Sequence, residues 1–524
     1  VLFLLRRAGR LDPADPVEAA SDRARQLAQQ IVVLLGGLPL ALDQAGAYIL
    51  ETSCGLEEYL ALYEQRHAAL LARRGRVPVE HPDSVGTAFA LAFERVERQN
   101  PASVELLRLC AFLAPDAIPE ALIVEGAKQL AEPLRSVAAD PLAFNEAIEV
   151  LRSLSLVQRH VQGKTLSLHR LVQTVLRDSM SEGEQRAWIE RGARLLEQAF
   201  PERSDLHVER WGWCEQLVPH VLLNADQCKE ERITLSEAAS LWHKAATYLR
   251  VRAQYGQAEL LFQRAVHIRE RILGPEHPEV AASLNGLVAL YGEQGQYEQA
   301  EPLARRVLRI REQALGPEHP EVARPLNNLA LISMDRGQYI EAERLYQRAL
   351  HIWEQALGPE HPNVTYPLNN LAENYRKQGQ YAEAEPLYRR ALSIREQEWG
   401  TEHPDVATSL NNLAELYREQ GRQEEAEPLA LCALAIREQA LRDEHLDTAE
   451  SLGTLASIYR ERGRYEEAEP LMQRALAIQE RIVGVEHPKL IGLLERYAGL
   501  LRQMGRPQEA AGFEERTRAI RERG

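Results

Sequence analysis

The fold is decided by one stretch, Asp405-Val-Ala-Thr-Ser-Leu-Asn-Asn-Leu-Ala-Glu-Leu-Tyr-Arg-Glu-Gln-Gly421, whose pattern returns every 42 residues. Leu410, Leu413 and Tyr417 stand at helical spacing and predict one apolar stripe on an amphipathic helix. Gly421 follows that stripe, where a helix commonly ends in a left-handed residue that glycine adopts without strain. A second helix is expected from about residue 424 to 441, so each repeating unit is a pair of helices.

Two sets of residues keep this interval through more than half of the chain. Alanine occupies one equivalent position in seven units, where a small side chain lets two helix axes approach closely: Ala258, Ala300, Ala342, Ala384, Ala426, Ala468 and Ala510. Histidine occupies another position in six units: His277, His319, His361, His403, His445 and His487. A fixed period of this length indicates helix pairs stacked on one another, an arrangement that usually offers a recognition surface rather than a catalytic pocket.

The six histidines are not expected to bind a metal ion. Zinc needs ligand atoms about 2 Å from one ion. Equivalent atoms in successive helix pairs should lie on the order of 10 Å apart, because packed helix axes are separated by about 8–10 Å. We therefore predict no metal site, and we expect each histidine to bond backbone groups at a helix end.

Composition excludes several classes of function. Of the 524 residues, 45% are hydrophobic and 27% are charged, as in an ordinary globular protein. The formal net charge of -15 argues against a nucleic-acid binder and against binding to anionic membranes. No apolar run is long enough to cross a bilayer. The five cysteines are scattered and never spaced C-x-x-C, which is typical of reduced thiols, so we predict a cytoplasmic protein. The chain lacks an initiator Met, and we expect it to begin inside a longer protein.

The repeating residues resemble the tetratricopeptide repeat, in the 42-residue form of kinesin light chains with Leu-Asn-Asn-Leu-Ala and Gly-Pro-Glu-His-Pro. The resemblance covers residues 235–524 and implies a right-handed superhelix of seven helix pairs. It also implies that a partner polypeptide binds the concave face, which the first helix of each pair lines. The first pair has Ala253 at the turn where the others have glycine, and the last departs from the pattern as a capping unit should.

The residues that match the family's peptide-contacting positions are Asn328, Asn370, Asn412, Arg376, Lys377, Arg418 and Arg460. An asparagine amide can both donate to and accept from an extended peptide backbone, and arginine offers forked donors to a carboxylate. An alternative interpretation is that these arginines form ion pairs with the neighbouring Glu373, Glu415 and Glu419.

The amino-terminal residues follow no such period. Two helical stretches fall within residues 17–50, and Pro39 is well placed to begin the second. Further helices are expected near 86–98, 101–113, 118–128 and 144–154, before a hairpin over 156–168 and a helix from about 169. This order is a winged-helix layout. We predict a helical domain at 1–80, a winged helix at 81–182, a helical adaptor at 183–234 and the repeats at 235–524.

Two motifs in this part are similar to the back half of the NB-ARC module, found in signalling nucleotide switches of the STAND class. They are Gly37-Leu38-Pro39-Leu40 and, after the winged helix, Leu168-His169-Arg170. The resemblance implies that Pro39 packs beside an adenine and that His169 contacts a β-phosphate, although Leu168 and Arg170 depart from the family triplet. The alternative is structural, with Pro39 as a helix start and His169 as a partly buried packing residue.

No enzymatic constellation emerges. Gly163-Lys164-Thr165 completes only the end of a phosphate loop and falls on the turn of the expected hairpin. The chain itself is therefore expected to hold no cofactor and to be no enzyme, whereas ADP or ATP would belong to the full-length protein. Few Lys or Arg in the winged helix argue against DNA binding.

We thus expect an all-α fold apart from one small hairpin, with the superhelical repeat array preceded by a helical bundle and a winged helix. The predicted function is a scaffold or sensor for protein–protein interaction, in the C-terminal part of a STAND-type signalling protein. One alternative is a stand-alone adaptor of the kinesin light chain kind. The other is a nucleotide-dependent switch enzyme.

Overall fold

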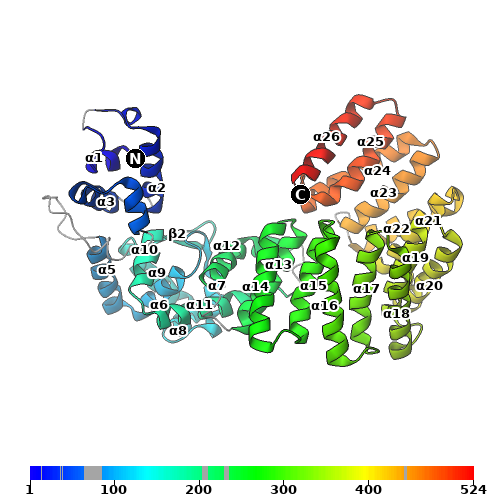
Figure 1. Cartoon of the computed structure of the whole chain (residues 1–524), viewed down its shortest axis with the longest axis horizontal. Helices are drawn as coiled ribbons and strands as arrows, with labels where there is room; N and C mark the ends of the chain where they lie inside the picture. Colours follow the sequence, from blue (N-terminus) through cyan, green and yellow to red (C-terminus); the bar gives the residue numbers. More distant parts are fainter. Residues whose placement is uncertain are drawn as a thin grey trace. The chain divides into compact units, whose positions relative to one another are not determined.

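The computed structural model contains two compact units, Val1–Ala245 and Ala246–Gly524 (Figure 1). The division falls within α13 (Ser236–Val251), close to where the repeats were expected to begin. The four-domain division remains a prediction. The structure describes residues 1–12, 15–35, 37, 39–63, 85–202, 210–228, 235–441 and 445–523.

The amino-terminal unit starts with α1 (Leu2–Arg7), η1 (Val17–Ala19), α2 (Asp22–Leu34) and α3 (Pro39–Thr52). Leu4, Leu5 and Ile31 are fully buried in the core that these helices share. Pro39 begins α3, as the sequence predicts, because a first helical residue needs no backbone N–H. Leu38 of the predicted motif lies outside the described residues.

The middle of this unit has the order expected for a winged helix. Its elements are α5 (Val85–Gln99), α6 (Pro101–Ala111), β1 (Ile118–Pro119), α7 (Glu120–Glu125), η2 (Ala127–Gln129), α8 (Leu134–Ala139), α9 (Pro141–Ser153), β2 (Val157–His160), β3 (Thr165–Leu168) and α10 (Arg170–Asp178).

The expected two-stranded hairpin is part of a three-stranded sheet, with the strands in the order β1-β3-β2. The sequence prediction placed residues 118–119 at the start of a helix, and this was wrong. Ile118 instead pairs antiparallel with Leu166 and is fully buried, so α7 begins only at Glu120. Helix α8 was not predicted. Gly163 lies between β2 and β3, the position that argued against a phosphate loop.

Helices α11 (Glu182–Ala199) and α12 (Trp211–Gln227) follow. A capping box between Ser181 and Glu184 fixes the start of α11. Trp188 and Trp211 are buried, and the Trp213 indole donates a hydrogen bond to the Ala199 carbonyl at 3.0 Å. All three tryptophans therefore make contacts within this unit.

The repeat array contains seven helix pairs within the described residues, coloured green to red in Figure 1. Their first helices are α13, α15 (Pro278–Glu293), α17 (Pro320–Asp335), α19 (Thr365–Lys377), α21 (Pro404–Glu419), α23 (Leu446–Glu461) and α25 (Ile491–Gln503). Their second helices are α14 (Tyr255–Leu273), α16 (Tyr297–Leu315), α18 (Tyr339–Leu357), α20 (Tyr381–Trp399), α22 (Gln423–Leu441), α24 (Tyr465–Val483) and α26 (Pro507–Arg523). Single turns η4 (Pro362–Val364) and η5 (Pro488–Leu490) precede α19 and α25.

Periodic residues hold these pairs together as predicted. The alanines that share one position in each pair are all fully buried. The turn glycine has a φ of 75° at Gly421 and nearly the same value in five other pairs, so a side chain there would be strained although space is open. In the first pair Ala253 takes the same left-handed conformation, with a φ of 56°.

The first helix pair of the array contacts the segment that leads into the last pair. The Nε2 atom of His487 lies 3.2 Å from the carbonyl oxygen of Val251, at the end of α13. Beside it, Arg252 donates to the Ile482 carbonyl at 3.4 Å. Residues more than two hundred positions apart in the sequence are therefore in contact.

Candidate partner-binding face of the array

The first helices of successive pairs contact one another directly. For example, α17 contacts α19, and α21 contacts α23. We call the surface that they form the first-helix face. Every predicted partner-binding residue lies on these helices: Asn328, Asn370, Asn412, Arg376, Lys377, Arg418 and Arg460.

Two of the predicted asparagines bridge neighbouring first helices. The amide nitrogen of Asn328 donates to Asn285 of the preceding pair at 2.8 Å, and that of Asn370 donates to Asn327 at 3.0 Å. The two asparagines of each bridge are 43 residues apart in the sequence, one more than the 42-residue period. Each asparagine therefore contacts the residue that precedes its own equivalent in the previous pair. Both side chains are half-buried, so each retains some exposed surface.

Asn412 instead lines an open pocket of about 420 Å³ on the first-helix face. The pocket brings together three of the predicted residues, Asn412, Arg376 and Arg418. Its other lining residues are Glu373, Tyr388, Asn411, Glu415, Glu419, Glu450, Thr454 and Arg496. Asn328, Asn370, Lys377 and Arg460 are not among the lining residues.

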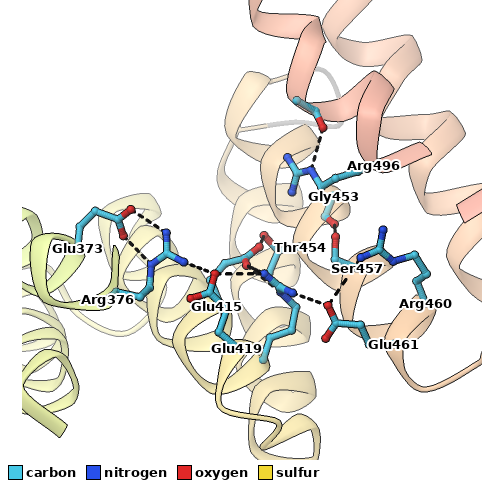
Figure 2. Close-up of polar contacts among 12 residues, drawn as sticks. Glu373, Arg376, Glu415, Glu419, Gly453, Thr454, Ser457, Arg460, Glu461 and Arg496 are labelled. Atoms are coloured by element: carbon cyan, nitrogen blue, oxygen red, sulfur yellow. Dashed lines mark hydrogen bonds and ion pairs between the residues drawn. The ribbon is translucent and has the colours of Figure 1, made fainter. Parts of the chain in front are cut away.

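Arg376 is held by two glutamates (Figure 2). It bonds Glu373 on its own helix through two hydrogen bonds of 2.7 Å, and it bonds Glu419 on the next first helix. Burial lowers the pKa of the Arg376 guanidinium, but its hydrogen bonds and charge interactions with both glutamates outweigh burial and raise that pKa.

Arg418 repeats this arrangement one pair later. Its Nε donates to Glu415 at 2.9 Å, and its Nη1 donates to Glu461 on α23. Burial raises the pKa of the Glu415 carboxyl, yet the Arg418 charge prevails and holds that pKa below its usual value. The ion-pair interpretation of these two arginines is confirmed, whereas their contact with a peptide remains a prediction.

Lys377 extends the series in the opposite direction, since it donates to Asp335 of the preceding pair at 3.0 Å. Arg460 forms no comparable hydrogen bond to a carboxylate among the described residues, and the Glu461 carboxylate lies 3.7 Å from its Nη2.

The sequence analysis did not predict the pocket residues Glu450, Thr454 and Arg496. Their signal was a departure from the repeat, because Thr454 and Arg496 stand where three other pairs have asparagine.

The periodic histidines act as helix caps, as predicted. In each of the six, Nδ1 accepts a hydrogen bond from the backbone N–H two residues later, at 3.1–3.2 Å. This bond satisfies one of the unpaired donors at a helix start. Among the described residues, no group of His, Cys, Asp and Glu could hold a metal ion.

The two residues linked to nucleotide contact lie in the amino-terminal unit. His169 caps α10, because its Nδ1 accepts from the Leu171 N–H at 3.2 Å. It also lines a pocket of about 640 Å³ with Val33, Ser155 and Arg170. Pro39 is placed only as the start of α3.

Comparison with known proteins places the repeats in a family. The tetratricopeptide repeat model matches residues 237–313, 280–332, 321–397, 366–439 and 440–523, and a domain of unknown function matches 94–185. A nucleotide-binding leucine-rich repeat (NLR)-like protein of Hyaloscypha variabilis is 31% identical over 273 residues, which are 49% of this chain. The chain spans 26% of the length of that curated relative.

Two solved structures are similar to parts of the chain. Repeats of a putative kinesin light chain from Podosopora anserina are 32% identical, with a TM-score of 0.34, over 39% of this chain and 98% of that one. A STAND protein with a tetratricopeptide repeat sensor from Pyrococcus horikoshii is 14% identical, with a TM-score of 0.37, over 92% of this chain and 72% of that one. No helix in the described parts of the chain has both the length and the apolar character needed to span a membrane.

Proposed function

Because the chain belongs to the tetratricopeptide repeat family, we propose that its array binds an extended segment of a partner protein along the first-helix face. The observation that carries this proposal is the pocket of about 420 Å³, to which α19, α21, α23 and α25 all contribute side chains. A pocket that spans several helix pairs suits a ligand that is long rather than compact. Its lining of amide, hydroxyl and charged groups suits a polypeptide backbone with polar side chains.

In the whole protein we expect the array to serve as a scaffold or sensor, within a signalling protein of the STAND type. The NLR-like relative supports this setting. In that arrangement His169 and Pro39 would contact ADP or ATP held by a nucleotide-binding domain outside this chain. A cytoplasmic location, no cofactor and no catalysis in the chain itself belong to the same proposal.

Partner binding is tested on a partner that has been captured by the array, purified and reconstituted with it. Replacing Asn412 by Ala removes a pocket amide without breaking either asparagine bridge, and Asn328→Ala with Asn370→Ala removes both bridges. We expect the triple variant to bind at least about tenfold more weakly, since each lost hydrogen bond contributes about 1 kcal/mol.

The matched control replaces Gln263, Gln347 and Gln473 by Ala. Each is an exposed amide on a second helix and donates to a glutamate of its own helix. Equal affinity of the triple variant and the wild type, measured by calorimetry on chains with unchanged circular dichroism, would remove the first-helix face as the binding site.

A stand-alone adaptor is the second candidate, favoured by the identity to kinesin light chain-like repeats. The coding sequence upstream decides between the two, because only the switch requires a phosphate loop there. Titration with ADP addresses the nucleotide-dependent enzyme, since tight ADP binding by this chain alone would support it.

A further inference from the structure

Neighbouring second helices of the array are joined by the same ion pair, with one exception in the described residues. An arginine in the middle of one second helix bonds a glutamate near the end of the preceding second helix, at 2.5–2.8 Å, and we call this contact the arginine bridge. Several of these arginines also donate to a backbone carbonyl of the linker beyond that helix. The bridges are Arg306–Glu270, Arg348–Glu312, Arg390–Glu354, Arg474–Glu438 and Arg516–Glu480.

The exception is the contact between α20 of the fourth pair and α22 of the fifth. Cys432 stands where the other second helices have the arginine, and its side chain is exposed. Glu396 stands at the position of the bridging glutamates and has no ion-pair partner in the described part of the chain. The boundary between the fourth and fifth pairs, which we call the fourth–fifth boundary, therefore lacks the arginine bridge.

The first helices lose a repeated bond at the same boundary. At the boundary before it, the Asn370 amide donates to Asn327 at 3.0 Å. Asn412 and Asn369 stand at the equivalent positions, but the Oδ1 atom of Asn369 is buried and accepts no hydrogen bond within the described residues. A buried acceptor without a partner is costly, which favours a second arrangement of this boundary in which Asn412 reaches it.

Between these two weakened contacts, α20 and α21 remain bonded at both ends. Near the end of α20, Arg395 donates to the Ser409 hydroxyl at 2.8 Å and to the Asp405 carbonyl at 3.0 Å. Near the beginning of α20, Glu385 accepts from the Tyr417 hydroxyl at 2.9 Å. The contact of α20 with α21 is therefore the axis about which the two sides of the fourth–fifth boundary can turn.

The ion pair of Arg376 with Glu419 also crosses this boundary, from α19 to α21 (Figure 2). This bond is exposed to solvent, and exposed ion pairs contribute little to stability. Arg376 keeps its bonds to Glu373 of its own helix when the boundary turns. Turning would move both of these side chains away from pocket residues on α21, such as Asn412.

The two far ends of the array are joined by a pair of hydrogen bonds, which we call the clasp. The Nδ1 atom of His487 accepts from the Lys489 N–H, so the neutral ring carries its hydrogen on Nε2. That Nε2 donates to the Val251 carbonyl at the end of α13, at 3.2 Å. Arg252 donates in the opposite direction, to the Ile482 carbonyl of α24 at 3.4 Å. The clasp thus links the first pair to the segment that enters the last.

We infer that the array is a clamp of two arms, pairs one to four and pairs five to seven, which turn about the contact of α20 with α21 and are held closed by the clasp. In the open arrangement the clasp is broken and the Asn412 amide can reach Asn369. The pocket of about 420 Å³ is complete only in the closed arrangement, because its lining residues come from both arms. This inference goes beyond partner binding and does not depend on it.

The angle between the arms is measured on the full chain by double electron–electron resonance, between nitroxide labels at Gln263→Cys of α14 and Gln473→Cys of α24. Both positions are exposed, and Cys432→Ser removes the exposed native thiol. A second pair of labels, at Gln263→Cys and Gln347→Cys, lies within the first arm. It reports changes that do not come from the fourth–fifth boundary.

Breaking the clasp should shift the arms to longer distances. His487→Asn with Arg252→Gln removes both clasp bonds, while asparagine retains the cap of the following helix. We expect the fraction of molecules at longer distances to rise at least about threefold, as the loss of one or two hydrogen bonds implies. The matched control, His319→Asn with Arg305→Gln, should change that fraction less than about 1.5-fold.

Restoring the arginine bridge should reverse this shift. In the clasp variant, Cys432→Arg instead of Cys432→Ser should lower the fraction at longer distances about twofold, because the arginine can then bond Glu396. Gln397→Arg, at an exposed position of α20, is the control for added charge. No rise on breaking the clasp, or an equal rise between the two labels of the first arm, would overturn the inference. A shift that Cys432→Arg reverses no better than Gln397→Arg would overturn it as well.

Discussion

The repeated histidine cap of the array can be compared with one long-range histidine contact of the amino-terminal unit. In the array six histidines make the same local bond, to a backbone N–H two residues later. In the amino-terminal unit His220 of α12 is 1% exposed, and its Nδ1 accepts from the Ala114 N–H, 106 residues earlier. A repeated local bond adds a small increment in each pair. A single long-range hydrogen bond stabilises the fold at one site only. Protonation of the His220 imidazole at low pH removes the acceptor of that bond.

The largest effect is therefore expected at His220. Burial lowers the pKa of His220 to about 4 from an unfolded value near 6.5. The unfolded chain binds this proton first, so the stabilisation is complete above about pH 6.5 and is lost as pH falls toward 4. The loss should approach about 3 kcal/mol.

Hydrogen exchange at the Ala114 amide, measured between pH 7 and 4.5 and corrected for intrinsic rates, checks this expectation. A His220→Gln variant should show a much flatter dependence on pH. Identical pH profiles for the two chains would contradict the assignment to His220.

Overpacking within the array should come next. Ala414 is fully buried where helices cross, and Ala414→Leu should cost about 1–3 kcal/mol in unfolding free energy. Ala440→Leu, at an exposed position of α22, is the matched control and should be nearly neutral. Urea denaturation of the two variants measures the difference.

The residue at the turn between the two helices of a pair can be changed from glycine to alanine in one pair and from alanine to glycine in another. Gly421→Ala should destabilise the array by about 1 kcal/mol, because φ there is 75°. Ala253→Gly should relieve the same strain in the first pair, where φ is 56°. Shifts of opposite sign in the urea midpoint are expected, and a shift of the same sign in both would contradict the account.

The smallest effect concerns a single histidine cap. His319→Ala should cost about 0.5–1 kcal/mol, and His319→Asn should restore most of it, since asparagine is also a good cap. His267→Ala, at an exposed position on α14, should leave the melting temperature unchanged. A loss at His267 as large as that at His319 would argue against the capping role.

The array could be predicted from the sequence because its contacts are periodic and mostly local. The stripe of Leu410, Leu413 and Tyr417 needs only helical spacing to find its buried side, and all three are buried. Strand β1 escaped prediction because two residues, Ile118 and Pro119, carry no period and pair with a strand almost fifty residues away.

The sequence predicts on which helices the candidate site residues lie, but not which glutamate each arginine contacts. Helical spacing places Arg376, Arg418 and Arg460 on equivalent surfaces. Which glutamate each arginine meets depends on how far one pair is rotated against the next, and the sequence alone does not state that rotation. Arg418 is held by Glu415 and Glu461, whereas the two equivalent positions for Arg460 contain Ser457 and Gln503. This difference could be recognised only after the structure had shown which residues hold Arg418.

Hydrogen–deuterium exchange on the array, free and with a purified partner, tests the central claim most directly. We expect slowed exchange in α19, α21, α23 and α25, whose side chains line the pocket, with α22 and α24, which contribute no lining residue, little changed. Protection confined to the second helices, with the first helices unaffected, would contradict it.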